Sequence, residues 1–174
     1  DGTLLSFYEE NLIKIGIDPT IKKYGSFYKK DIIKVIDFFN AEIFLKSSKN
    51  RKADLITSIS MFYDLPDPNA FVKNITECLS PEGIWNLEQS YMPSMLRTNS
   101  YDTICHEHLE YYSLEVLKKL LEKNNLRIID VIFNKINGGS FSVTACHKNA
   151  SYLSNKKIID WMLGQEKRME LDSP

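Results

Sequence analysis

The chain is expected to be a doubly wound, Rossmann-like α/β domain with a mostly parallel sheet, and three observations predict this. Short apolar segments alternate with amphipathic ones, which implies parallel strands joined by crossover helices. Residues 53–60 are nearly continuous in apolar and small side chains, as in a strand covered on both faces. Residues 126–133 and 140–147 alternate on either side of Asn137-Gly-Gly, which predicts a closing antiparallel hairpin.

Length and composition set the class of protein. The 174 residues suit one domain with a sizeable core; residues 1–150 are expected to form it, and residues 151–174 to begin a C-terminal segment. A net charge of −1 gives no electrostatic case for nucleic acid or an anionic membrane. The expected partner is a small-molecule substrate, and composition indicates no oligomeric state.

The three cysteines and the apolar runs bear on location. The cysteines are odd in number and far apart, which argues against a disulfide framework and fits a reducing, cytoplasmic compartment. No CxxC pair is present, so no structural zinc site is predicted in this chain. No apolar run approaches the length of a membrane span, and no signal peptide opens the sequence.

The first part of the chain is expected to alternate helix and strand. Residues 6–11 are predicted to form a helix, 14–17 a strand and 35–39 a third strand, with Asn40 as its polar tip. Asp18-Pro-Thr ends the strand 14–17, and nucleotide-binding sheets place a carboxylate there against ribose hydroxyls. Because Asp-Pro is also an ordinary turn, this position alone allows both interpretations.

Aromatic and polar side chains follow the next two predicted strands. Phe62 and Tyr63 come after residues 53–60, and Glu88 lies near the end of the strand 84–90. In open α/β sheets, the carboxyl ends of the strands carry the ligand. The two aromatic residues therefore read either as core residues or as walls of a cofactor pocket.

Helices are predicted where apolar residues recur at helical spacing. One helix starts at Pro68, capped by Asp67, and runs to about residue 79. Residues 80–83 are expected to form a turn. An amphipathic helix is predicted over residues 113–123, and another over residues 155–168.

The most unusual stretch is residues 101–112, which holds two of the three histidines together with acids, a cysteine and tyrosines. No apolar period fits it, so burial alone does not explain it. Imidazole can move a proton near neutral pH, and Glu107 between His106 and His108 could raise a histidine's basicity. From these residues alone, a catalytic loop with a histidine base and a polar loop capping the next helix are equally open. A zinc site through both histidines is disfavoured, since positions i and i+2 share a face only in extended chain.

Segments in order along nearly the whole chain resemble the sugar C-methyltransferase family, of which NDP-hexose C-3-methyltransferases are typical. Asp1-Gly-Thr-Leu-Leu resembles the end of the family's cofactor loop, and Gly16-Ile-Asp-Pro-Thr a second family segment. Residues 53–58, with Asp67-Pro68, are similar to its fourth-strand segment. Thr103-Ile-Cys-His-Glu-His resembles the signature Thr-Ile-Tyr-His-Glu-His, which is the specific match, and Gly138-Gly-Ser the family's Gly-Gly-Ser turn.

The resemblance implies a class I methyltransferase fold and transfer of a methyl group from S-adenosylmethionine to carbon, typically C3 of a nucleotide-linked 4-ketosugar. A carbon next to a carbonyl must lose a proton before it attacks the methyl group, which requires a base and donors for the enolate oxygen. By the resemblance, His108 would be the base, and Glu107 and His106 would orient it or contact the sugar.

The resemblance also implies two sets of binding residues at the carboxyl edge of the sheet. The expected cofactor contacts are Gly2, Asp18, Pro19, Asn40, Ala41, Ser60, Met61 and Phe62. The expected substrate contacts are Tyr63, Glu88, Tyr101, Tyr111, Tyr112 and Ser140. Cys105 departs from the pattern, because the family has a tyrosine there that is implicated in catalysis; either Tyr101 substitutes for it or the acceptor differs.

The family pattern further implies that this chain is truncated at both ends. The family begins with a cysteine-rich zinc-binding domain and the first strand of the cofactor fold, and it continues into a second α/β domain; zinc is expected only in that first domain. Without the first strand, the strands 14–17 and 53–60 would present unpaired edges, so the isolated polypeptide is expected neither to bind S-adenosylmethionine nor to unfold cooperatively. The alternatives are an NAD-type oxidoreductase, against which the hairpin and the His-Glu-His element stand, and a non-catalytic fragment.

Overall fold

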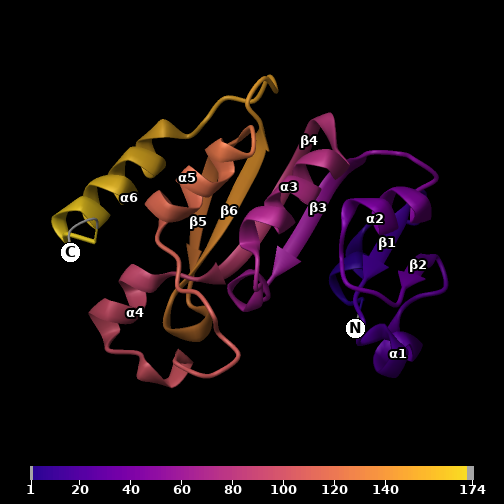
Figure 1. Cartoon of the computed structure of the whole chain (residues 1–174), viewed down its shortest axis with the longest axis horizontal. Helices are drawn as coiled ribbons and strands as arrows, with labels where there is room; N and C mark the ends of the chain where they lie inside the picture. Colours follow the sequence, from indigo (N-terminus) through magenta and orange to yellow (C-terminus); the bar gives the residue numbers. More distant parts are fainter. Residues whose placement is uncertain (1, 172–174) are drawn as a thin grey trace. The chain divides into compact units, whose positions relative to one another are not determined.

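The computed structural model describes residues 2–171, which fall into two compact units that divide between Lys52 and Ala53 (Figure 1). Both units alternate strands with helices, and the larger one contains a mixed sheet. The predicted α/β class is therefore confirmed, including its closing antiparallel hairpin. No ladder joins the two sheets within residues 2–171.

The first unit is built on two parallel strands, β1 (Lys14–Ile17) and β2 (Ile32–Val35), with Lys14 opposite Ile32. Its helical segments are η1 (Leu4–Phe7), α1 (Ile21–Tyr24), η2 (Gly25–Phe27) and α2 (Ala41–Ser47). Ile21, Ile32 and Phe44 are its buried apolar side chains, together with Ala41.

Two predictions for this unit were wrong. The strand expected at residues 35–39 lies earlier, because pairing with β1 runs from Ile32 to Val35 and then stops; Phe38 beyond it is 75% exposed. The helix expected at residues 6–11 is only the short 3-10 turn η1, and Tyr8 after it is extended. A single helical turn forms few hydrogen bonds for the number of residues whose backbone it fixes. The local sequence pattern therefore does not extend η1 into a longer helix.

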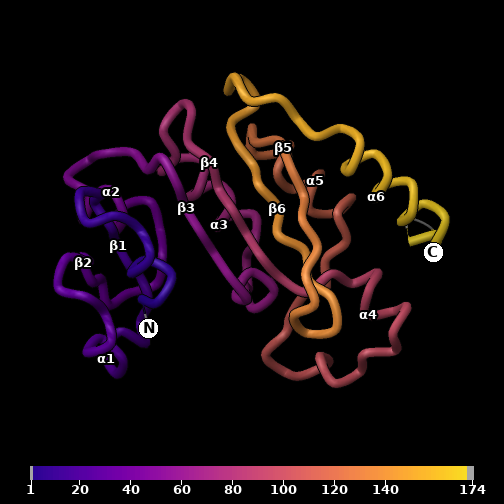
Figure 2. Tube along the Cα trace, turned by 180° about the vertical axis from the view of Figure 1, so that it is seen from behind, coloured from indigo at the N-terminus to yellow at the C-terminus, as the bar shows by residue number. Residues whose placement is uncertain are grey.

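The second unit is a four-stranded sheet in the order β3-β4-β6-β5 (Figures 1 and 2). The strands are β3 (Ala53–Ile59), β4 (Leu79–Ser90), β5 (Leu126–Asn134) and β6 (Ser140–His147). β3 and β4 are parallel, and β6 is antiparallel to both β4 and β5. The expected turn at 80–83 is instead part of β4, although the ladder passes from Leu79 opposite Ala53 to Ile84 opposite Leu55.

Helices cover one face of this sheet. α3 (Pro68–Cys78) and α5 (Leu114–Lys123) lie side by side on it, and α6 (Lys156–Arg168) contacts α5 and β5 (Figure 1). The predicted cap is present, because Asp67 accepts from Ala70 N at 2.9 Å. Ser113 caps α5 in the same way by accepting from Val116 N. Between the layers lie fully buried side chains, among them Val72, Ile75, Trp85, Leu87, Leu117, Leu121 and Val143.

The helices in the described part of the chain, residues 2–171, include none that is long and apolar enough to cross a bilayer.

Candidate functional site

The carboxyl end of β3 begins the candidate site with a constrained residue. Ser60 has a left-handed backbone, with φ of 51°, and its N–H donates to the Glu88 carbonyl at 2.8 Å. This conformation is uncommon for a residue with a side chain, and such residues cluster at functional sites. Ser60 thus links the ends of the two strands whose carboxyl edge is expected to carry the ligand.

The aromatic pair after Ser60 divides between two roles. Phe62 is 1% exposed, and its ring centre lies 5.9 Å, 5.7 Å and 5.2 Å from those of Phe71, Trp85 and Tyr112. Its side chain is therefore a core element, the first of the two interpretations left open; a cofactor contact through Phe62 stays a prediction. Tyr63 is also buried, but its ring centre lies only 4.4 Å from that of His108.

The histidine loop, which runs between Tyr91 and Tyr112, is attached by backbone hydrogen bonds to Tyr63 and to the end of β4. The Tyr63 carbonyl accepts from Leu109 N at 2.9 Å and Glu110 N at 3.1 Å. At the base of the loop, Tyr91 and Tyr112 form an isolated parallel bridge, and Met92 N donates to the Tyr112 carbonyl at 3.0 Å. The segment in between contains α4 (Met92–Thr98) and η4 (Tyr101–Thr103).

His108 is held in one orientation. Its Nδ1 lies 2.7 Å from the Thr103 carbonyl oxygen, to which the Tyr111 hydroxyl also donates at 3.4 Å. A carbonyl oxygen can only accept, so Nδ1 must carry the hydrogen. In the neutral ring, Nε2 then keeps its lone pair and can take a proton. The structure thus assigns His108 the tautomer that a general base needs.

The other predicted residues of the loop lie on the surface. The His106 side chain is 92% exposed and the Glu107 side chain 74%, and they approach each other only to 4.0 Å. Tyr101 and Cys105 are also exposed. The structure does not bring these side chains to His108, so their contacts with a substrate stay predictions.

Asp64 is a neighbour of the loop that the sequence analysis missed. Asp64 is exposed as a residue, but partial desolvation raises the pKa of its carboxyl; the charge of His108 opposes this shift, and the charge of Glu107 adds to it. The carboxyl of Asp64 is therefore close enough to both residues to feel their charges. The sequence could have indicated Asp64 as a neighbour of the loop only through its position, one residue after Tyr63 in η3 (Phe62–Asp64).

Unsatisfied polar atoms gather where β4 ends. Within the described part of the chain, both amide atoms of Gln89 and the hydroxyls of Ser90 and Tyr112 are buried without a hydrogen-bond partner. Burial also raises the Tyr112 pKa, and the charge of Glu110 adds to the effect. Leaving such a group unpaired costs about 1–3 kcal/mol, which makes these atoms candidates for bonds to a ligand. Glu88 is half-buried in the same strand.

The Gly-Gly-Ser turn, residues 138–140, packs against Ser94 and Ser100, in the segment that precedes the two histidines. Gly138 and Gly139 have φ of 75° and 125°, and a Cβ on Gly138 would come within 2.8 Å of the Ser100 hydroxyl oxygen. A Cβ on Gly139 would lie 2.8 Å from the Cβ of Ser94. Ser140 is 2% exposed and donates to the Ile136 carbonyl at 2.9 Å, so it stabilises the turn; its contact with a substrate stays a prediction.

In the first unit, Asp18 stands at the carboxyl end of β1. Its N–H donates to the Val35 carbonyl at 3.1 Å, and its Oδ1 accepts from Thr20 N at 2.6 Å. Asp18 is half-buried as a residue, and its contact with ribose hydroxyls stays a prediction. The ring of Tyr28 lies against Gly2, where an added Cβ would be 2.6 Å away. Burial, and then the Asp18 charge, raise the Tyr28 pKa, which places Tyr28 beside both predicted cofactor residues.

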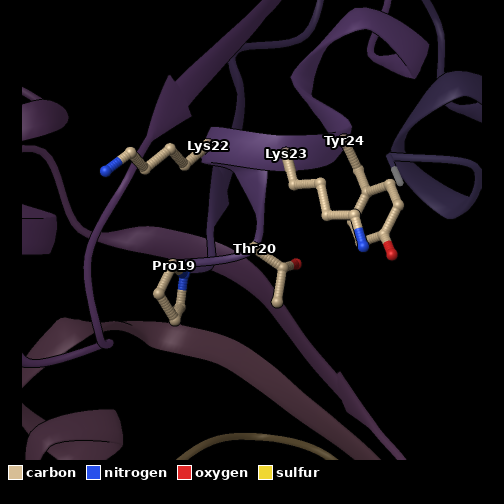
Figure 3. A pocket seen from close by; sticks show the side chains of 5 residues that line it. All are labelled: Pro19, Thr20, Lys22, Lys23 and Tyr24. Carbon is tan, nitrogen blue, oxygen red and sulfur yellow. The ribbon is translucent and has the colours of Figure 1, made fainter.

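The remaining predicted cofactor residues have structural partners of their own. Asn40 caps α2, its Oδ1 accepting from Ile43 N at 2.9 Å, and Ala41 is 5% exposed. Met61 is half-buried. Pro19 lines an open depression whose other walls are Thr20, Lys22, Lys23 and Tyr24 (Figure 3). There, Lys23 Nζ lies 5.0 Å from the centre of the Tyr24 ring, while Lys22 points away.

Comparison with known proteins places the chain in a family. Residues 3–131 match the family model described as a methyltransferase domain, which is most of the chain. The chain belongs to this family. The methyltransferase domain is also similar to the C-methyltransferase NovU of Streptomyces niveus, with 29% identity over 154 residues. This match covers 88% of the chain but spans only 36% of the length of that curated relative.

Solved structures support the fold of the methyltransferase domain. The N-methyltransferase NodS of Bradyrhizobium japonicum superimposes with a TM-score of 0.54 at 15% identity, covering 76% of this chain and 72% of that one. The O-methyltransferase NcsB1 from neocarzinostatin biosynthesis, solved in complex with S-adenosylmethionine, gives 0.57 at 14% identity, covering 84% and 46%. The class I, Rossmann-like fold is therefore shared with these enzymes. Among residues 2–171, no three metal-binding side chains cluster.

Proposed function

We propose that the protein containing this domain transfers the methyl group of S-adenosylmethionine to a carbon next to the carbonyl of a nucleotide-linked keto sugar, with His108 as the general base. Membership of the methyltransferase family and the likeness to a C-methyltransferase support the reaction class and disfavour an oxidoreductase. The sugar acceptor rests on the resemblance of the His-Glu-His segment.

One observation carries the proposal: the 2.7 Å contact between His108 Nδ1 and the Thr103 carbonyl oxygen. It fixes the hydrogen on Nδ1 and leaves Nε2 as the proton acceptor. An imidazole takes a proton well near neutral pH, which is what removal of a proton next to a carbonyl requires. The neighbouring ring of Tyr63 supports the imidazole from the side.

The enolate that forms needs hydrogen-bond donors. The Tyr112 hydroxyl and the Gln89 amide are buried and unpartnered within the described residues, so they can bond a substrate oxygen without first breaking an internal bond. Donors held in a dry site stabilise a developing oxyanion more than donors in water do. We assign Tyr112 to this role, and Gln89 to orienting the acceptor.

The cofactor, when bound, supplies a methyl group on a positively charged sulfur. Asp18 would hold its ribose hydroxyls, since a carboxylate at a strand tip is the usual acceptor for them. The observation that fits is the half-buried carboxylate of Asp18, of which Oδ1 accepts from Thr20 N. The Tyr28 ring beside Asp18 and Gly2 would flank the same position.

The test is substitution of His108 by Asn in the full-length protein, with His106→Asn as the matched control on the same loop. His108→Asn keeps an N–H that can donate to Thr103 but removes the base, so turnover should fall roughly 10²–10⁴-fold. Deuterium exchange at the acidic carbon of the acceptor should fall with it. Binding of S-adenosylmethionine, measured by calorimetry, should remain unchanged.

His106→Asn should keep proton exchange, because its side chain lies in solvent; a loss of turnover with exchange retained would report the sugar contact that the family resemblance implies for it. Full exchange at the acidic carbon in His108→Asn would refute the assignment of the base. A loss of cofactor binding in the same variant would show that the histidine serves the cofactor and not the acceptor.

A further inference from the structure

A buried carboxylate on the last helix connects both ends of the histidine loop. Glu166, near the end of α6, is 3% exposed. Its Oε1 accepts from the Tyr91 hydroxyl at 2.7 Å and from Leu114 N at 2.7 Å, and its Oε2 accepts from Glu115 N at 2.9 Å. Tyr91 lies just before the loop, and Leu114 lies just after it.

The position of Glu166 suits a carboxylate electrostatically. Leu114 and Glu115 are the first two residues of α5, whose N–H groups have no partner within their own helix. Negative charge is favoured at a helix N-terminus, where the helix dipole is positive. Ser113 accepts from Val116 N at 3.3 Å, so the first turn of α5 is capped partly by its own serine and partly by a residue from another helix.

The N-terminal end of α6 is also held by hydrogen bonds, so the position of Glu166 does not depend only on the bonds of its own carboxylate. Asn155, just before the helix, donates its N–H to the Ile129 carbonyl at 2.7 Å and its side chain to Asp130 at 3.0 Å. Arg127 on β5 holds the preceding turn through Lys148, Ala150, Tyr152 and Ser154. The helix therefore leaves the sheet at a set point and carries Glu166 to the base of the loop.

Resting on the proposed role of His108, we infer that Glu166 is a positioning residue for methyl transfer: it fixes both ends of the loop that carries the base. The bridge between Tyr91 and Tyr112 closes the loop. Glu166 accepts from the Tyr91 hydroxyl on one side of this bridge and from the first N–H groups of α5, just after Tyr112, on the other. The contact geometry of His108 then depends on α6, a helix that the sequence analysis assigned to a following segment. A misplacement of about 1 Å at the reacting groups can cost on the order of 100-fold in rate.

The experiment uses Glu166→Gln in the full-length protein, with Asp160→Asn on the exposed side of the same helix as the control for charge. Glutamine has the same shape, but its NH₂ group faces an N–H donor, so one of the three bonds is lost. We expect kcat to fall on the order of 10-fold with the KM for S-adenosylmethionine unchanged, and Asp160→Asn to match the parent protein. Tyr91→Phe, which removes one bond and leaves the α5 cap intact, should give a smaller loss of the same kind and serves if Glu166→Gln does not fold.

A second readout does not depend on activity. Nitrogen-15 NMR of the His108 ring reports whether Nδ1 carries the hydrogen. In Glu166→Gln and Tyr91→Phe, the signal should move toward a mixture of the two tautomers, because the contact with Thr103 is no longer held. A purely structural role would lower the melting temperature while leaving both this signal and kcat per folded molecule unchanged, and that result would overturn the inference.

The two proposals can fail separately. If His108→Asn retains turnover while Glu166→Gln still alters the His108 ring signal, the base is wrong and the positioning of the loop stands. If His108→Asn abolishes proton exchange while Glu166→Gln changes neither the ring signal nor kcat, the positioning role is wrong and the base stands.

Discussion

The loop that carries both histidines divides into an outer half, residues 104–107, and a docked half, residues 108–112. Every side chain of the outer half is exposed. In the docked half, backbone N–H groups donate to the Tyr63 carbonyl, His108 contacts Thr103, and Tyr112 pairs with Tyr91. Two histidines with one residue between them therefore lie in different surroundings, and what distinguishes them is the contact of His108 with the Thr103 carbonyl.

The largest effect that separates the two halves is expected from Tyr112→Phe. The change removes a buried, unpartnered hydroxyl, so the free energy of unfolding should stay constant or rise by up to about 1–3 kcal/mol. Turnover should fall on the order of 100-fold if that hydroxyl bonds the substrate oxygen. Chemical denaturation and steady-state kinetics measure the two effects. A loss of stability with full turnover would mean that the hydroxyl has an internal partner instead.

In the outer half, Cys105→Tyr should have a smaller effect. Cys105 is exposed, and exposed substitutions usually change stability by less than about 0.5 kcal/mol. The melting temperature should therefore be kept, and turnover should be kept or raised, because the related family has a tyrosine at this position. A large drop in turnover would show that the outer half has been reshaped for a different acceptor.

The smallest effect is expected in how the free energy of unfolding changes with pH as the Asp64 carboxyl titrates. Its pKa is raised, foremost by burial, so the folded protein holds that proton more tightly than the unfolded chain does. Its contribution to the free energy of unfolding must therefore fall as pH rises from the ordinary aspartate value, about 4, through the raised one. Urea titrations of the parent and Asp64→Asn above and below this window should show the parent losing stability relative to the variant as pH rises. The opposite sign would contradict the raised pKa of this carboxyl.

The sequence predicted best those features that depend on nearby residues. Asp67 caps its helix through a hydrogen bond from a residue three positions ahead, so the pattern and the contact lie in the same short stretch. The continuous apolar run of β3 and the glycine turn of the hairpin are equally local. The α/β class followed from the order of these elements, whereas the methyltransferase type of the fold was implied by the family resemblance.

Features that depend on distant partners could not be predicted. The position of β2 depends on its register with β1, and the apolar residues that follow Val35 gave a misleading local signal. Glu166 caps α5 from a helix far along the chain, and nothing near Leu114 indicates it. The left-handed backbone of Ser60 and the contact of His108 with Thr103 arise from the way the strand ends meet the loop. The sequence could therefore nominate candidate residues, but it could not predict which of them are held by distant partners.

The bridge between Tyr91 and Tyr112 lets the exposed turn between α4 and η4 vary in length. Because the two ends of the segment are already joined at the base, the entropic cost of closing it rises slowly with length, by about 0.6 kcal/mol for each doubling. Lengthening this turn would therefore cost little folding free energy, while the contact of His108 with Thr103 and the pairing of β4 with β6 keep their own hydrogen bonds.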